Sequence, residues 1–189
     1  SKGDICAFID SDAYPRVDWL GNAIKYFEDR SVGAVGGPGL TPANNHIRQK
    51  ASGYVTSTFM VGGLSGRYKS RMLKEVDDLH SCNFIVRRSL IEEAGGWNER
   101  YWPGEDTLMC LAIRNAGFKI VEANDVVVYH HRRPLFTEHL TQISRFGLHR
   151  GFFAKKFGGN SLHLTYFMPS IALVTFVLLP VLSTLTSIA

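Results

Sequence analysis

Residues 5–12 read ICAFIDSD, an apolar run that ends in two acids, Asp10 and Asp12. This pattern predicts a buried strand over Ile5–Asp10, followed by a turn. In open α/β sheets, ligands bind just outside the carboxyl ends of strands. Two carboxylates at such an edge repel each other unless a cation lies between them, and their oxygens suit Mg²⁺ or Mn²⁺. The same residues also fit an acidic turn in which Asp12 or Asp18 caps the next helix.

Strands and helices alternate along the chain that follows. Helical spacing of apolar residues predicts helices, and short apolar runs predict strands. The expected helices are 17–29, 44–60, 105–116 and 137–157, with a short one from residue 89, and the expected further strands are 32–36, 83–86 and 126–129. This alternation is typical of an α/β sandwich. Gly62–Asp78 is polar, basic and contains glycine, so we expect a loop there, one able to close as a lid.

Further chemical groups stand at element ends. Glu105 and Asp106 open a predicted helix, where acids act as caps or, when held rigidly, as a general base. His130 and His131 end a strand and offer metal ligands, but neighbours on a strand point to opposite faces, so at most one faces a shared site. A solvated basic strand end explains them equally well.

Composition limits the class of protein. The 189 residues are 45% hydrophobic and 20% charged, as expected for one globular domain. The net charge is +4, and Glu138 is the sole acid among residues 130–189, so the basic excess lies near the C-terminus. This distribution argues against a nucleic-acid-binding domain. The three cysteines have no C-x-x-C spacing and predict buried free thiols.

The C-terminal stretch has the character of a membrane segment. No Asp, Glu, Lys or Arg follows Lys156, and residues 164–189 are mostly apolar, whereas ~20 apolar residues span a bilayer. Arg150, Lys155 and Lys156 precede this stretch, so the positive-inside rule puts the preceding domain in the cytoplasm. The alternative is a buried helix of a soluble protein.

These features divide the chain into three parts. We expect residues 1–135 to form the C-terminal portion of a larger domain, because an apolar central strand stands at their very start. Residues 136–160 are expected to form an amphipathic helix at the membrane interface, and residues 161–189 a transmembrane helix.

Taken in order, four stretches resemble glycosyltransferase family 2, of GT-A fold. They are FIDSDAYP (8–15), GGPGLTP (36–42), CNFIVRRSLIEEAGGWNERYWPGEDTLMCLAIRNAGFKI (82–120) and VVVYHHRR (126–133). The third is the most specific, because it combines N-x-x-x-R-R, G-G-W-N-E, G-E-D and G-F-K-I. The resemblance covers about residues 3–157 and implies an α/β, Rossmann-like sandwich that is N-terminally incomplete.

The resemblance also implies roles for individual residues. Asp10 and Asp12 match the D-x-D that binds a divalent metal, Mg²⁺ or Mn²⁺, and the donor diphosphate, with His130 as a hypothetical third ligand. Asp106, with Glu105 beside it, matches the acid pair whose Asp is the general base. Q-x-x-R-F resembles the Q-x-x-R-W element, with Phe in place of Trp, which weakens a prediction of processive synthesis. The other expected contacts are Arg145 and Arg150 with the diphosphate, and Gly37, Trp97, Gln142 and Phe146 with acceptor or sugar.

The implied function is inverting transfer of a sugar from a nucleotide-sugar donor to an acceptor hydroxyl, in cell-envelope or extracellular glycan synthesis. The implied partners are the donor, a glycan or lipid-linked acceptor and the membrane, with the catalytic domain on the cytoplasmic side and no nucleic acid. The family's nucleotide-base pocket precedes residue 1, so we expect this chain alone to bind nucleotide poorly and to be inactive.

Two other classes of protein also fit part of this sequence. Haloacid-dehalogenase-like phosphoryl transferases also have a strand ending in D-x-D, and Asp77 and Asp78 would then supply further metal ligands. That reading leaves G-G-W-N-E and the apolar C-terminal stretch unexplained. The other is a non-catalytic, membrane-anchored binding domain.

Overall fold

A five-stranded mixed sheet forms the centre of the molecule. The computed structural model describes residues 2–58 and 73–188, with side chains as far as Pro180. The sheet order is β1 (Ile5–Phe8), β6 (Phe84–Arg87), β3 (Val32–Gly36), β7 (Lys119–Glu122) and β5 (Lys74–Glu75). Only β3 and β7 are parallel; the other neighbouring strands of this sheet are antiparallel.

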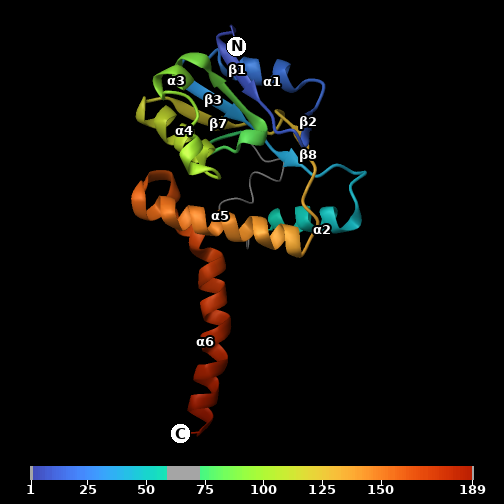
Figure 1. The fold of residues 1–189 in the computed structure, drawn as a ribbon, viewed down its shortest axis with the longest axis vertical. Coiled ribbons are helices and arrows are strands. Elements are labelled where there is room, and N and C mark those ends of the chain that lie inside the picture. The colour runs from blue at the N-terminus through green and yellow to red at the C-terminus, as the bar shows by residue number, and fades with distance from the viewer. Residues whose placement is uncertain (1, 59–72, 189) are drawn as a thin grey trace.

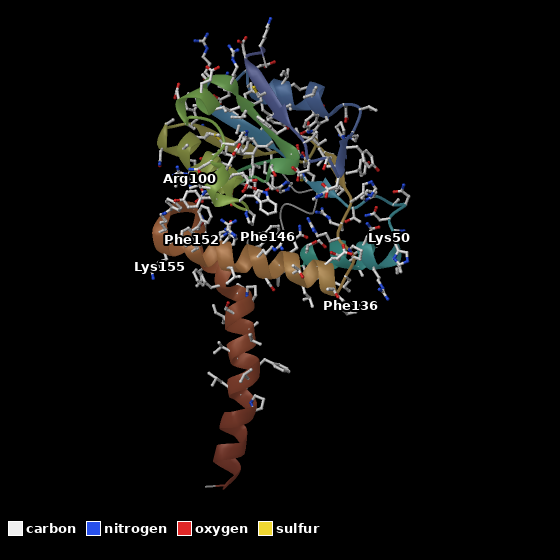
Figure 2. All side chains as sticks on the ribbon, in the orientation of Figure 1. Lys50, Arg100, Phe136, Phe146, Phe152 and Lys155 are labelled. Atoms are coloured by element: carbon white, nitrogen blue, oxygen red, sulfur yellow. The ribbon has the colours of Figure 1, made fainter. Side chains whose placement is uncertain are left out.

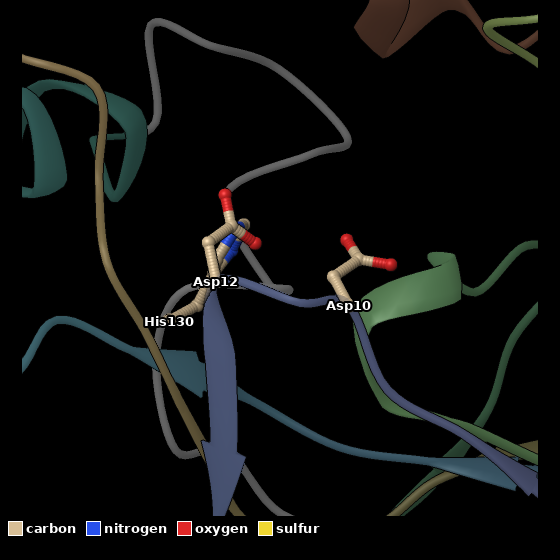
Figure 3. A group of neighbouring side chains, drawn as sticks. All are labelled: Asp10, Asp12 and His130. Carbon is tan, nitrogen blue, oxygen red and sulfur yellow. The ribbon is translucent and has the colours of Figure 1, made fainter.

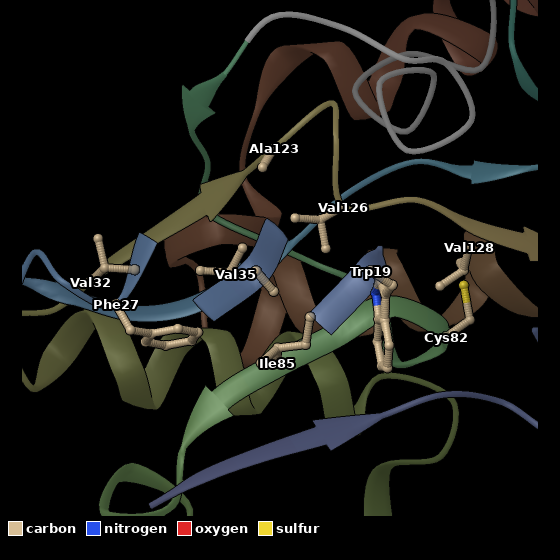
Figure 4. Packing of buried hydrophobic residues seen from close by; sticks show 10 residues of the cluster. Trp19, Phe27, Val32, Val35, Cys82, Ile85, Ala123, Val126 and Val128 are labelled. Carbon is tan, nitrogen blue, oxygen red and sulfur yellow. The ribbon is translucent and has the colours of Figure 1, made fainter. Parts of the chain in front are cut away.

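Helices cover both faces of this sheet, and the alternation of side chains along its strands explains why (Figure 1). On one face, Val35 and Ile85 pack with Trp19 of α1 (Trp19–Tyr26) (Figure 4). On the other, Ala34 and Phe84 pack against α3 (Arg88–Glu93) and α4 (Glu105–Asn115). Successive strand residues therefore bury opposite faces, which confirms the predicted α/β sandwich.

A smaller sheet extends this body. It consists of β2 (Ala13–Pro15), β8 (Val128–His130) and β4 (Gly39–Leu40), with β8 in the middle. The side chain of Asn83 links α1 to the segment that leads into β8, because Oδ1 accepts from Trp19 Nε1 at 2.8 Å and Nδ2 donates to the Val126 carbonyl at 2.7 Å. Asn83 lies in the 3₁₀ turn η2 (Ser81–Asn83) and is 1% exposed, so this bridge belongs to the core.

Two helices form a platform beside the carboxyl ends of β1 and β8 (Figure 1). They are α2 (Ile47–Thr56) and the 20-residue α5 (Thr137–Lys156). Ser52 Oγ and His139 Nδ1 lie 2.8 Å apart where the two helices meet, and both residues are buried. Three further 3₁₀ turns, η3 (Glu99–Tyr101), η4 (Gly159–Ser161) and η5 (Leu164–Phe167), flank α4 and α5.

The C-terminal helix α6 (Met168–Ile188) points away from the rest of the molecule (Figure 1). The part of the chain that the structure describes holds no helix with both the length and the apolar character to cross a bilayer. The transmembrane helix predicted for 161–189 is therefore not confirmed. The turns η4 and η5 take up the first residues of the predicted segment.

Three other predicted segments, 137–157, 62–78 and 44–60, are described only in part or have other bounds in the structure. The helix predicted over 137–157 is present as α5, but its placement in a membrane interface stays a prediction. Most of the lid loop predicted for Gly62–Asp78 lies outside the described residues, and its described end contains β5. Predicted helix 44–60 is shorter in the structure, since α2 begins only after His46, whose ring accepts from the Arg48 amide.

Candidate active site

A cavity of about 510 Å³ lies between the strand ends and the α5 platform. Its wall contains nine of the eleven predicted site residues. They are Asp10, Asp12, Glu105, Asp106, His130, Gln142, Arg145, Phe146 and Arg150. Segments far apart in the sequence thus meet at one place, which makes this cavity the candidate active site.

Gly37 and Trp97 are the two predicted residues that do not line the cavity. Gly37 lies where the chain leaves β3, and a Cβ on it would overlap the backbone oxygens of Ala123 and Val126. The Trp97 ring packs edge-on against Phe8, with ring centroids 5.0 Å apart. Both positions serve close packing, and their contact with acceptor or sugar stays a prediction.

Strand pairing brings Asp12 and His130 together. In the antiparallel pair of β2 and β8, Ala13 is the register partner of His130, and the His131 amide donates to the Asp12 carbonyl at 2.9 Å. The Asp12 carboxylate and His130 Nε2 consequently lie 3.1 Å apart. One ligand atom each from Asp10, Asp12 and His130 fall within 4.8 Å of one another (Figure 3).

The two adjacent histidines have different surroundings. His131 Nδ1 lies 2.6 Å from Asn45 Oδ1, and its ring is 5.8 Å from that of Tyr14, whereas His130 faces the two aspartates. The geometry therefore distinguishes two residues that the sequence left open, and it selects His130 for the acidic cluster.

A buried arginine sets the state of His130. Arg132 Nη1 lies 3.0 Å from His130 Nδ1, and since a guanidinium only donates, Nδ1 accepts and the ring proton sits on Nε2, facing Asp12. The same arginine donates to the Gly39 carbonyl and, at 3.4 Å, to Thr41 Oγ1. Burial and the charge of Arg132 lower the pKa of His130 to about 4, although Asp12 opposes the shift, so the imidazole is neutral near pH 7.

Negative charge gathers around Asp10. Burial raises the pKa of Asp10 above its ordinary value, a hydrogen bond from the Ser81 side chain opposes this, and the charges of Asp12 and Glu105 raise it further. Glu105, which lines the same cavity from the start of α4, thus acts electrostatically on Asp10. Three carboxylates near one another favour a proton or a cation between them.

The acid pair Glu105–Asp106 begins α4 next to a glycine that the fold requires. Gly104 has a φ of 128°, and a Cβ there would lie 2.6 Å from the Phe153 ring of α5. Glu105 Oε2 accepts from the Gly104 amide at 2.9 Å, and Asp106 Oδ1 accepts from the Thr107 amide at 2.7 Å. The acids therefore bind amides at the helix start, as the capping interpretation expected, and also line the cavity.

The two arginines predicted to bind a diphosphate differ in their surroundings. Arg145 is exposed, lines the cavity and makes no hydrogen bond or ion pair with any side chain in the described ranges. Arg150 is 19% exposed, and its Nη2 donates to the Asp78 carboxylate at 3.0 Å. Its guanidinium also stacks 4.4 Å from the centre of the Tyr166 ring. Arg145 is thus available to an anion, whereas Arg150 is already paired.

Gln142 and Phe146 lie beside Arg145 on the α5 surface that lines the cavity, and Figure 2 locates Phe146 midway along this helix. Some wall residues were not predicted. Ser81, which hydrogen-bonds to Asp10, and Trp102, which is 65% exposed, give no signal in the sequence beyond their nearness to N-x-x-x-R-R and G-E-D.

The acids Asp77 and Asp78 do not join the cluster. Asp77 pairs with Arg114 and with His163, whose Nε2 lies 2.7 Å away, and Asp78 pairs with Arg150. Cations of the protein therefore occupy both carboxylates. This arrangement removes the further metal ligands that the phosphoryl-transferase interpretation needed.

The mixed α/β fold is similar to that of solved GT-A-like glycosyltransferases. The structure of the mannosyltransferase PcManGT from Pyrobaculum calidifontis, in complex with GDP-Man and Mn²⁺, superposes with a TM-score of 0.56 at 20% identity, covering 100% of this chain and 56% of that one. TarS 1–349 of S. aureus, in complex with UDP-GlcNAc, gives 0.50 at 17% identity, over 82% of this chain and 43% of that one.

The chain belongs to glycosyl transferase family group 2, whose sequence profile matches residues 5–189. It is 24% identical over 147 residues to glycosyltransferase AglE of Haloferax volcanii, which is 78% of this chain and 45% of AglE. It is 27% identical over 137 residues to the pre-mycofactocin glycosyltransferase of Mycobacterium tuberculosis, which is 70% of this chain and 28% of that protein. The chain spans less than half the length of these curated relatives.

Proposed function

We propose that the protein containing this chain is a metal-dependent, inverting glycosyltransferase that moves a sugar from a nucleotide-sugar donor to an acceptor hydroxyl. The observation that carries the proposal is the cavity in which Asp10, Asp12 and His130 gather within 4.8 Å while Glu105 and Asp106 line the same wall. Family membership supports the reaction class, and the two structural neighbours contain GDP-Man and UDP-GlcNAc.

The residues of the cluster fit a divalent cation. Asp10 and Asp12 offer hard oxygen ligands, and the raised pKa of Asp10 reflects burial and acid–acid repulsion that a cation would relieve. His130 is neutral, as a ligand must be, but its Nε2 proton would have to move to Nδ1 and displace Arg132. We therefore assign Mg²⁺ or Mn²⁺ to Asp10 and Asp12, and His130 would join as a third ligand only once its Nδ1 carries the proton and no longer accepts from Arg132.

The chain's own residues can divide the remaining work. Asp106 accepts the proton of the acceptor hydroxyl, whose oxygen then bonds to the anomeric carbon as the bond to the diphosphate breaks on the opposite face. Glu105 lies beside it in the sequence, and its charge acts on Asp10. Arg145 binds the departing diphosphate, whose charge a divalent cation at Asp10 and Asp12 would also neutralise.

The acceptor and the place of action belong to the same proposal. Gln142 and Phe146 line the cavity next to Arg145 and are assigned to the acceptor or the sugar. We propose a glycan or lipid-linked acceptor and a membrane location with the catalytic domain on the cytoplasmic side. Support comes from Lys155 and Lys156 at the end of α5 and from exposed apolar side chains on α6, such as Phe176 at 78%. Loss of vesicle binding on deleting residues 168–189 would test this location.

One experiment tests the reaction. Release of nucleoside diphosphate by the full-length protein is measured over a panel of sugar nucleotides, with and without Mn²⁺ or Mg²⁺. We expect release from one donor that needs the metal and that Asp10→Asn abolishes. Release from no donor by a well-folded protein, with or without acceptor glycans, would contradict the proposal.

The base assignment has its own test. Asp106→Asn should lower turnover about a thousandfold and leave the donor Kd nearly unchanged, because the acid acts on the acceptor and not on the donor. Turnover within tenfold of the wild type would exclude Asp106 as the general base. In that case Glu105→Gln decides whether its neighbour takes the role.

A further inference from the structure

The acid pair Asp77–Asp78 has no part in the proposed reaction, yet one of its members is among the most buried acids of the protein. The Asp78 side chain is 3% exposed, and it lies next to Thr107, which is 4% exposed. Thr107 is the third residue of α4 and directly follows Asp106. A buried carboxylate therefore touches the helix turn that contains the proposed catalytic acids.

Asp78 joins two helices through one oxygen. Its Oδ2 accepts from Thr107 Oγ1 at 3.2 Å and from Arg150 Nη2 at 3.0 Å. Asn160, 3% exposed, adds a second link when its Nδ2 donates to the Thr107 carbonyl at 3.1 Å. Arg150 is itself held by Ser161 Oγ at 3.2 Å. The first turn of α4 is thus fastened to α5 and η4 from two directions.

The start of α4 needs such support. Its N-cap residue is Gly104, which has no side chain to bind the free amides of the first turn. The acids that do bind amides there, Glu105 and Asp106, are the same groups that must keep a fixed direction toward the cavity. Contacts from outside the helix must therefore hold the turn in place. They meet at Thr107, which donates to Asp78 and accepts from Asn160.

We propose that Asp78 is a positioning residue for the acid pair Glu105–Asp106, acting through the hydroxyl of Thr107, and that Arg150 serves this contact by orienting Asp78. The proposal rests on the proposed function of the acid pair. It gives Arg150 a role through Asp78 in place of direct contact with the donor diphosphate.

The test compares Thr107→Val, which replaces the hydroxyl by a methyl group of similar size, with Thr107→Ser, which keeps the hydroxyl. In the full-length protein, Thr107→Val should lower kcat about tenfold and leave the donor KM within about twofold, because only the direction of the acids changes. Thr107→Ser should restore kcat to within about twofold of the wild type. A purely structural role would lower thermal stability without this split between kcat and KM.

The matched control is Asp77→Asn, the same chemical change on the neighbouring acid, whose partners Arg114 and His163 lie away from the first turn of α4. Asp78→Asn should lower kcat as Thr107→Val does, and Asp77→Asn should not. An unchanged kcat in Thr107→Val, an equal loss in Thr107→Ser, or an equal loss in Asp77→Asn would each overturn the proposal.

A second readout does not depend on catalysis. Amide hydrogen exchange in residues 105–110 should become about tenfold faster in Thr107→Val and stay at the wild-type rate in Thr107→Ser, with β3 and β6 unchanged in both. Equal exchange in the two variants would overturn the positioning role. A wild type that transfers no sugar but shows the expected exchange would instead contradict the proposed function and leave the contact established.

Discussion

Replacement of Arg150 by methionine should destabilise the protein strongly, because it removes the cation that pairs with a buried acid. The Arg150–Asp78 pair is 3.0 Å long, with side chains 19% and 3% exposed. Removing one partner of a buried pair costs ~3–5 kcal/mol, and we take ~3 because Asp78 keeps the Thr107 hydroxyl bond. Loss of the stacking on Tyr166 adds ~0.5–1 kcal/mol. At about 2–4 °C per kcal/mol, the total of about 3.5–4 kcal/mol should lower Tm by roughly 7–16 °C.

The assay is thermal and urea unfolding of Arg150→Met beside Arg145→Met, the same change on an exposed arginine of the same helix. We expect Arg145→Met to change stability by less than about 0.5 kcal/mol. Donor binding should show the opposite pattern to stability. The donor Kd should rise in Arg145→Met and stay close to the wild-type value in folded Arg150→Met. If Arg150→Met kept the stability of Arg145→Met and lost donor binding, Arg150 would be a diphosphate ligand and the ion-pair reasoning would be refuted.

Three further outcomes follow from the packing. Gly37→Ala should cost about 3 kcal/mol or more, measured by urea unfolding, since its Cβ would overlap the Val126 carbonyl; near-native stability would contradict the close approach. Trp97→Leu should lower stability by about 2 kcal/mol and leave the donor Kd unchanged. Weaker donor binding at full stability would instead indicate the predicted contact of Trp97 with the sugar. Burial lowers the pKa of His139, so the unfolded state takes up its proton first as pH falls below about 6.5 and stability drops there. His139→Asn should flatten this part of the pH–Tm curve, and an unaltered slope would exclude His139 as its cause.

Much of the fold follows from short-range patterns. The buried strand β3 and the helix α4 lie where apolar runs and helical spacing predict them. The strands β2, β4 and β5 were not predicted, because runs of two or three residues have no periodicity to detect and their pairing depends on distant partners. The helix α1 is shorter than predicted, ending at Tyr26, since apolar spacing continues past the last helical turn to the buried Phe27.

The site divides in the same way. Asp10, Asp12 and Asp106 stand at a strand end and a helix start, which are local signals, and the cavity brings them together. The approach of Asp12 to His130 depends on the register of β2 with β8, which local patterns do not contain. Likewise, nothing near Arg150 in the sequence indicates that Asp78, 72 residues earlier, neutralises it.

Binding of Mn²⁺ to the full-length protein, in the presence of a nucleoside diphosphate, tests most directly whether Asp10 and Asp12 form a metal site. Binding is measured as the loss of the electron paramagnetic resonance signal of free Mn²⁺. Asp12→Asn is compared with the wild type and with Asp77→Asn, which changes an acid outside the cluster. We predict one Mn²⁺ site, whose affinity falls at least about tenfold in Asp12→Asn and stays unchanged in Asp77→Asn. Equal Mn²⁺ binding by all three proteins would contradict the assignment of the cluster as the metal site.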